Sequence, residues 1–286
     1  KGQSDDRASP ILLGKSSLER WVFAHVLPCK GTGHDHCAKI LGDEMKLAGQ
    51  SRFIAKSDQE PAILDLRRAA AKLATEQHGC NIQFENSSVG ESQANGLAEN
   101  TVKTVKGLVR ALKHAYEELH GVRVEQDSAV LTWMVPYAAA MHNRGQRGAD
   151  GKTAYELRKG KSYRKKNPPF GEKVMYLPAG KRSSTLTSKW EEGLYFGLVN
   201  ASDEVYIGMA DGVIRARSVQ RLSPSLRGDG ELAKKVLGTP WRPVPKDETI
   251  SMVPVTTKIV AGAVVADAQL PRALRTEESV SRRIYI

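Results

Sequence analysis

A row of charged residues at helical spacing is the first feature of this sequence that could do chemistry. One acidic residue and four basic residues recur at intervals of four and three positions: Glu99, Lys103, Lys106, Arg110 and Lys113. Because residues three and four apart lie on one face of a helix, the row predicts a solvent-facing stripe. Such a stripe attracts phosphate groups. It is also typical of a solvated helix face stabilised by a Glu99–Lys103 pair, so the spacing leaves both interpretations open.

The helix that carries this row is predicted from about Asn95 to Leu119. Its apolar positions repeat with the same alternation of fours and threes, and they are Ala98, Val102, Val105, Val109, Leu112, Tyr116 and Leu119. This repeat predicts one buried stripe along the helix. The charged row and the apolar stripe therefore occupy neighbouring faces of one amphipathic helix.

Strands and helices alternate ahead of the long helix. The predicted elements are an antiparallel hairpin over 11–28, a helix over 34–47, a strand over 52–56, a helix over 61–77 and a strand over 81–85. This order predicts an α/β domain built on a mixed sheet. Asp58 then stands at the C-terminal end of a strand, just before Pro61 opens the next helix. A helix-capping role is the alternative for Asp58.

The composition favours a globular protein that binds phosphate. The chain has 286 residues, with 43 Lys and Arg against 32 Asp and Glu, so its formal net charge is +11. With 40% hydrophobic and 26% charged residues, it falls outside the collagen-like, coiled-coil and wholly disordered classes. An aromatic content of 6% argues against base stacking as the main mode of nucleic-acid binding. No run of about 18 apolar residues occurs, so we expect no membrane-spanning helix.

The cysteines and the first residues suggest where the protein works and how it is made. Cys29, Cys37 and Cys80 are an odd number with no close pairing in the sequence, which favours a reducing compartment. The sequence starts at Lys1, with no initiator Met and no apolar signal region. We therefore expect a fragment of a larger product.

The second half of the chain is predicted to hold a helix over 128–142, a basic segment and a small β domain. Between 151 and 192 there are eleven Lys and Arg against four Glu. Within that segment, the cluster Arg164, Lys165 and Lys166 is interpreted as a phosphate-binding loop, a nuclear-localisation patch or a solvated charge run. Five short strand-like runs between 174 and 222 suggest a small barrel. We expect a core domain over 1–145, a basic connecting segment over 146–169, a small β domain over 170–225 and a mostly disordered linker over 226–286.

Three segments resemble motifs of retroviral-type integrases, most closely the copia-type retrotransposon branch. Lys56-Ser57-Asp58-Gln59-Glu60-Pro61 is similar to the second acidic motif, and Asn95-Gly96-Leu97-Ala98-Glu99-Asn100 to the third. Gly151-Lys152-Thr153-Ala154-Tyr155-Glu156-Leu157 resembles the segment downstream of that core, with Ala154 in place of the usual proline. Phe170-Gly171 and the strands after it fit the β region that follows, so the resemblance covers about 10–225.

The resemblance implies a ribonuclease H-like mixed sheet with flanking helices, followed by a small β-barrel-like domain. It implies Asp58 and Glu99 as catalytic metal ligands, with Glu91 as the rival to Glu99. The first carboxylate of the family lies on a first strand that is missing here, because the hairpin 11–28 corresponds to the second and third strands. Asp5 and Asp6 precede that hairpin, where a connecting turn is the preferred interpretation and the missing first metal ligand is the alternative.

The implied activity is transesterification that inserts element DNA into target DNA. It requires two Mg²⁺ or Mn²⁺ ions, one activating the attacking hydroxyl and one stabilising the leaving oxygen, and such hard cations prefer carboxylate ligands. No zinc is expected, since His34, His36 and Cys37 lie too close together to form the family's zinc module and fit a helix start better.

The implied partners are the element's DNA ends and the target duplex, bound by a homo-oligomer. DNA contacts are expected from Lys103, Lys106, Arg110, Lys113 and the cluster 164–166. The location is expected to be nuclear, after a stage in a cytoplasmic particle. Two alternatives stay open. One is a truncated or decayed element protein that binds nucleic acid without catalysis, and the other is a nuclease of the same fold that hydrolyses RNA in hybrids.

Overall fold

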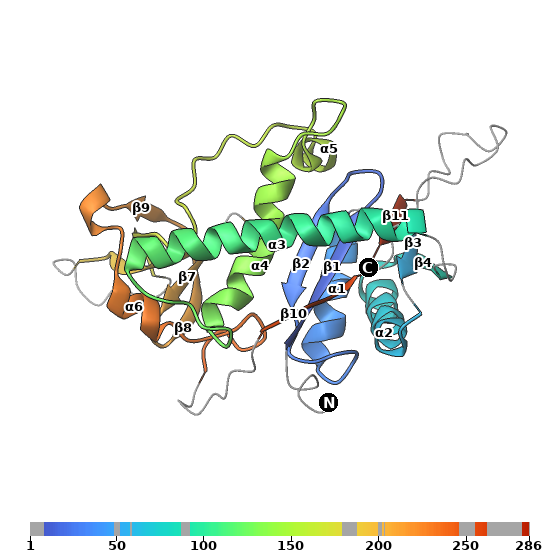
Figure 1. Ribbon diagram of the computed structural model, residues 1–286, viewed down its shortest axis with the longest axis horizontal. Coiled ribbons are helices and arrows are strands. Elements are labelled where there is room, and N and C mark those ends of the chain that lie inside the picture. The colour runs from blue at the N-terminus through green and yellow to red at the C-terminus, as the bar shows by residue number, and fades with distance from the viewer. Residues whose placement is uncertain are drawn as a thin grey trace. The chain divides into compact units, whose positions relative to one another are not determined.

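The computed structural model describes residues 9–48, 52–57, 59–86, 92–178, 188–199, 202, 204–245, 255–261 and 282–285. These residues form helices and sheets, which confirms the predicted mixed α/β class (Figure 1). The chain divides into two compact units, each described by itself below. Unit 1 comprises 1–106, 139–163 and 255–286, and unit 2 comprises 107–138 and 164–254. The unit boundaries differ from the expected ranges. They fall inside two long helices, over 92–120 and 129–145, so each helix has one part in each unit.

The sheet of unit 1 is mixed. It holds β1 (Ser9–Ser16), β2 (Val22–Val26), β3 (Arg52–Ser57), β4 (Asn81–Asn86), β10 (Val255–Ala261) and β11 (Arg282–Tyr285). β1 and β2 form the predicted antiparallel hairpin, and β3 and β4 are parallel. Along the sheet the order is β10-β1-β11-β3-β4, with β2 also paired to β1. β11 runs antiparallel to β1 and parallel to β3.

Two helices cover the sheet of unit 1, and their bounds match the predicted ones. Helix α1 (Asp35–Leu47) starts after His34, whose side chain accepts a hydrogen bond from the backbone N–H of His36. Helix α2 (Pro61–His78) begins with a proline in its first turn and ends at Gly79, whose φ of 66° is the left-handed conformation that glycine adopts most easily. Both helices contribute to one apolar core with the strands, and its members include Leu12, Phe23, Leu41, Ala55, Ile63 and Leu66.

The segment 139–163 belongs to unit 1 through buried polar contacts with the hairpin. The side chain of Asn143, near the end of α4 (Ala129–Gly145), bonds to both backbone groups of Val22, at 2.8 and 2.6 Å. Arg158 of α5 (Ala154–Lys159) forms a buried ion pair with Glu19, 2.7 Å from Nε to Oε2. The guanidinium also lies over the Trp21 ring, 4.1 Å from its centroid. A buried charge therefore has both an ionic and an aromatic partner.

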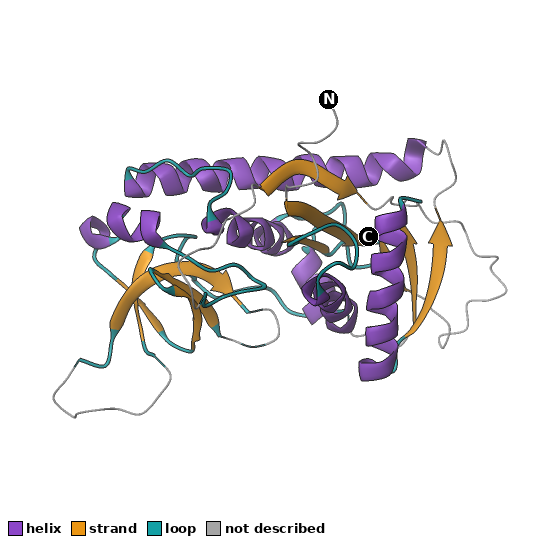
Figure 2. Ribbon diagram, turned by 90° about the horizontal axis from the view of Figure 1, so that it is seen from below, coloured by secondary structure: helices purple, strands orange, loops and turns teal. Residues whose placement is uncertain are grey.

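The longest helix is α3 (Ser92–His120), which is visible lengthwise in both views (Figure 1, Figure 2). It confirms the helix predicted over 95–119. Of the predicted apolar stripe, Val105 and Tyr116 are buried, while Leu119 is 38% exposed. The others whose side chains are described, Val102, Val109 and Leu112, are half-buried.

Unit 2 contains an antiparallel sheet of five strands in the order β8-β7-β6-β5-β9. The strands are β5 (Lys173–Tyr176), β6 (Glu191–Leu198), β7 (Val205–Met209), β8 (Gly212–Ala216) and β9 (Val219–Arg221), which confirms the five predicted runs. Aromatic side chains dominate its core, among them Tyr116, Trp133, Phe170, Tyr195 and Phe196. Among the described strand pairs β8 pairs with β7 and β9 with β5, so closure into a barrel stays a prediction.

The region expected to be a linker contains regular structure where the chain is described. After the short η1 (Pro224–Leu226), helix α6 (Gly230–Lys235) is capped by the Asp229 side chain, which accepts from the N–H of Leu232 at 2.9 Å. Ala233 and Val236 join the core of unit 2. Further on, β10 and β11 join the sheet of unit 1, and the β-branched residues of β10 suit a strand. Across the described part of the chain, no helix has the length and apolar character needed to span a bilayer.

A buried histidine makes the stability of unit 2 depend on pH. The backbone N–H of Asp229 donates to Nδ1 of His120 at 2.9 Å, so Nε2 carries the proton that is donated to the carbonyl of Gly171, also at 2.9 Å. Both contacts fit the neutral ring. Burial is the main cause that lowers the pKa of His120 below its usual 6.5. The unfolded chain therefore takes up a second ring proton more readily than the folded chain does. The free energy of unfolding falls as the pH drops below about 6.5, the usual pKa of histidine.

Replacing His120 by Asn should reduce this pH dependence. The amide oxygen keeps an acceptor for the Asp229 N–H but cannot be protonated. We expect His120→Asn to cost about 1–2 kcal/mol at pH 7.5, because one hydrogen bond and ring packing are lost. On acidification to about pH 5.5 the variant should lose less stability than the wild type. Urea unfolding at both pH values measures this, and an equal loss in the two proteins would contradict it.

Candidate nucleic-acid interface

The C-terminal ends of β3 and β4 meet at one edge of the sheet of unit 1. The two strands are parallel, and their last paired residues are Ser57 and Asn86. Asp58 directly follows Ser57 in the chain but lies outside the described residues. Ser57 is fully buried, and α2 starts four residues after it. At this edge the end of β3, the predicted carboxylate Asp58 and the start of α2 therefore follow one another in the sequence.

Arg67 of α2 forms hydrogen bonds to both strands at this edge. Its Nη1 donates to the carbonyl oxygen of Glu85 at 2.9 Å, to Oγ of Ser57 at 3.1 Å and, more weakly, to the carbonyl oxygen of Ala55 at 3.4 Å. The guanidinium also lies 4.6 Å from the ring centroid of Phe84. Arg67 is 3% exposed, and burial is the main cause that lowers its pKa. A guanidinium keeps its proton in proteins, so a positive charge lies beneath the edge.

The sequence analysis missed Arg67, although a signal was present. Arg67 lies four positions after Ile63 and three before Ala70, and both of these are buried. A charged residue in the apolar row of a helix is buried with it, and a buried charge needs polar partners. The row therefore indicated a buried guanidinium, but not which acceptors it would reach.

The charged row of α3 is exposed at some positions and partly covered at others. In unit 1, Glu99 and Lys103 are exposed and Lys106 is half-buried. In unit 2, Arg110 is exposed, while Lys113 is half-buried and its ammonium lies 3.1 Å from the Glu117 carboxylate. Lys113 is therefore partly neutralised within the helix, and Lys103 and Arg110 are better placed to meet a phosphate.

The cluster Arg164, Lys165 and Lys166 lies in unit 2, in a stretch without helix or strand, and all three residues are exposed. Exposure suits each of the interpretations drawn from the sequence. The cluster thus stays a predicted phosphate-binding or localisation segment.

The metal site stays a prediction. Within the described ranges, no group of three or more His, Cys, Asp or Glu side chains lies close enough to hold a metal ion. Glu99 is exposed, as a residue that meets a metal and a DNA strand must be. Its predicted partner Asp58, the rival Glu91 and the pair Asp5 and Asp6 all lie outside the described residues. His34 caps α1, in agreement with its interpretation as a helix start.

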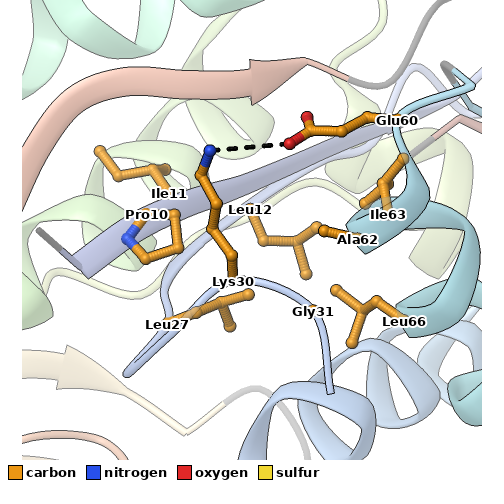
Figure 3. A pocket seen from close by; sticks show the side chains of 10 residues that line it. All are labelled: Pro10, Ile11, Leu12, Leu27, Lys30, Gly31, Glu60, Ala62, Ile63 and Leu66. Atoms are coloured by element: carbon orange, nitrogen blue, oxygen red, sulfur yellow. Dashed lines mark ion pairs between the residues drawn. The ribbon is translucent and has the colours of Figure 1, made fainter. Parts of the chain in front are cut away.

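A pocket in unit 1 does not coincide with these charged residues. Its lining is mostly apolar and comes from β1, the loop after β2 and the start of α2. Figure 3 shows the Lys30 ammonium and the Glu60 carboxylate facing each other, 3.6 Å apart, with the apolar side chains around them. Because its polar groups already pair with each other, the pocket offers no evident chemistry.

Comparison with known proteins adds no relative. No protein-family model matches the chain, and a search of curated proteins found no match.

The role of Arg67 can be tested against its neighbour. Arg67→Met should destabilise the chain by about 2–3 kcal/mol, because it removes hydrogen bonds to β3 and β4 while keeping much of the buried volume. Arg68→Met is the matched control. Arg68 is exposed and forms an ion pair with the exposed Asp65, at 3.2 Å, so its replacement should change stability by no more than about 0.5 kcal/mol. Equal losses of stability for the two variants in urea unfolding would contradict this role of Arg67.

Proposed function

We propose that this chain is the core of a copia-type retrotransposon integrase with a ribonuclease H-like fold, followed by a small β domain. The parent protein inserts element DNA into target DNA by metal-dependent transesterification. One observation carries the proposal. The parallel strands β3 and β4 end opposite each other at Ser57 and Asn86, so the segment that continues into Asp58 and the segment that leads to Glu99 leave the same edge of the sheet.

The strand pairing around β1 supports a sheet with room for a further strand. β2 occupies one edge of β1, and β10 and β11 occupy the other. A strand joined to the start of β1 by a hairpin would run antiparallel to β1. β11 runs antiparallel to β1 and parallel to β3, so its position is one that such an upstream strand would fit.

The start of α5 supports the downstream motif. Thr153 caps the helix in a capping box with Glu156, so Ala154 is its first residue. Proline is favoured at that position, because the missing N–H would have no helical partner there. Ala154 therefore occupies the first position of the helix, where the proline usual in the family would be favoured.

The proposed chemistry needs oxygen ligands for Mg²⁺ or Mn²⁺. Asp58 and Glu99 would supply two carboxylates, and the first strand of the parent would supply the third. When bound, the ions activate the attacking hydroxyl and stabilise the leaving oxygen. Arg67 would act as a positioning residue, since it holds the strand ends from which the chain continues towards both carboxylates.

DNA binding follows from charge and exposure. The net charge of +11 attracts a phosphate backbone, and Lys103, Arg110 and the cluster 164–166 present exposed cations. Such contacts position the protein without reading sequence. The homo-oligomer and the nuclear location belong to the same proposal, through the resemblance alone.

A second candidate is a truncated or decayed element protein that binds nucleic acid without catalysis. The observation that favours it is the sequence of the two strands beside β1. β10 is Val-Thr-Thr-Lys-Ile-Val-Ala and β11 is Arg-Arg-Ile-Tyr, and neither contains a carboxylate. Where that edge of β1 is described, β10 and β11 occupy it and supply no candidate for the first acidic residue.

Strand transfer by the longer protein, extended upstream, separates the two candidates. Asp58→Asn and Glu99→Gln should each reduce joining of element ends to target DNA by about 100-fold or more, with DNA binding within about twofold. Glu118→Gln, at an exposed position of the same helix, is the matched control and should stay active. Retained joining in Glu99→Gln would overturn the site. DNA binding without joining in the unaltered protein would favour the second candidate.

DNA affinity measured over a range of salt concentrations tests the contacts. The slope of log K against log salt is negative, and each lost phosphate contact should make it less steep by about 0.9. We expect that loss for Lys103→Ala. Lys113→Ala should change the slope much less, because Glu117 already pairs with that ammonium. The assignment is wrong if Lys113→Ala costs as much affinity as Lys103→Ala.

A further inference from the structure

Two cysteines that the sequence left unpaired lie side by side in unit 1. Cys29 lies in the loop between β2 and α1, and Cys37 lies in the first turns of α1. Their Sγ atoms are 3.9 Å apart, and the Cys37 thiol also lies 3.6 Å from the carbonyl oxygen of Cys29. The spacing of the cysteines in the sequence did not indicate this contact, which arises because the loop turns back on the helix start, and all three cysteines are free thiols.

We propose that Cys29 and Cys37 form a redox-sensitive pair that closes to a disulfide under peroxide. A disulfide needs a separation of about 2.0 Å, so the sulfur atoms must approach by about 1.9 Å from their 3.9 Å contact. The change requires a movement of the Cys29 side chain or of the loop that carries it, since Cys37 is held in α1. Gly33 leaves room for the Cys29 sulfur, because a Cβ at position 33 would lie only 3.2 Å from that sulfur.

The two thiols differ in the way that a reacting and a resolving cysteine differ. Cys29 is half-buried, so part of its side chain is open to solvent and to peroxide, whereas Cys37 is completely buried. Burial, and then the neighbouring Cys29, raise the pKa of Cys37 to about 12. The thiolate is the form that peroxide oxidises, so Cys29 should react first.

The reaction balances with hydrogen peroxide as the oxidant. The Cys29 thiolate attacks one peroxide oxygen, the O–O bond breaks, and a sulfenic acid and hydroxide form. The Cys37 sulfur then attacks the Cys29 sulfur and displaces the hydroxyl group, which leaves as water with the Cys37 proton. In sum, two thiols and one peroxide give one disulfide and two waters. A dithiol reverses the step by exchange.

The bond would fasten a loop that contacts α2. Lys30, next to Cys29, pairs with Glu60 at the start of α2, and a Cβ at Gly31 would lie 3.6 Å from Ala62. These residues form one wall of the pocket in Figure 3. Oxidation would therefore tie this wall to the first turns of α1 and stabilise the folded chain by restricting the unfolded one.

Cys80 provides an internal control. It is buried in the same apolar core, and its thiol lies 4.0 Å from the carbonyl oxygen of His78. Burial raises its pKa as well. Because Cys80 is shielded by burial, we expect it to remain a thiol.

The test is a thiol count and peptide map of the native full chain after hydrogen peroxide, with alkylation of the remaining thiols. The wild type should fall from three thiols to one, with a Cys29–Cys37 cross-linked peptide that dithiothreitol removes. Cys80→Ser should fall from two thiols to none. Cys29→Ser should keep both thiols, and Cys37→Ser should give a Cys29 sulfenic acid that dimedone traps.

Three outcomes would overturn the pair. They are three thiols retained in the wild type, a covalent dimer in place of the internal link, or Cys29 oxidised to sulfinic acid while Cys37 stays reduced. The wild type and Cys80→Ser keep both cysteines of the pair, so the result does not depend on how well Cys37→Ser folds. None of these readouts involves DNA or strand transfer, so this proposal can fail separately from the proposed function.

Discussion

The buried guanidinium of Arg67 is the interaction on which the candidate site depends. One side chain from α2 bonds to the end of β3 at Ser57 and to the end of β4 at Glu85. A buried charge is stable only when polar groups surround it, so α2 and both strand ends must keep one arrangement. The chain segments that continue towards Asp58 and Glu99 therefore leave from a fixed edge.

Ionic contacts of buried glutamates link distant parts of the chain in each unit. In unit 1, Arg158 forms an ion pair with Glu19 across 139 positions, and both side chains are buried. In unit 2, the buried Glu172 accepts two hydrogen bonds of 2.6 Å from the exposed Arg221. Removing the arginine of either pair takes a partner away from a buried carboxylate. These contacts specify which segments belong to each unit, while the apolar cores supply most of the stabilisation.

The strands beside β1 connect the fold to the question of function. β1 accepts β10 and β11 on the edge away from β2, so residues late in the chain complete a sheet that starts with the earliest described ones. An unpaired strand edge is a site where another strand adds readily. The same edge is where an upstream strand with a carboxylate would compete with β10 and β11.

The sequence by itself determined most of the elements up to β9 and their order, but it did not predict α5, α6, β10 or β11. Pro61 predicted the start of α2, and the four-and-three repeat predicted α3, because these signals act within a few neighbouring residues. Only the tertiary structure decided that Arg67 binds two strand ends, that Glu117 partly neutralises Lys113 in the charged row, and that Cys29 meets Cys37. It also decided that β11 pairs with β1 and β3. Most of these contacts join residues that are far apart in the chain or separated by a turn, and periodicity carries no information about which partners a fold brings together.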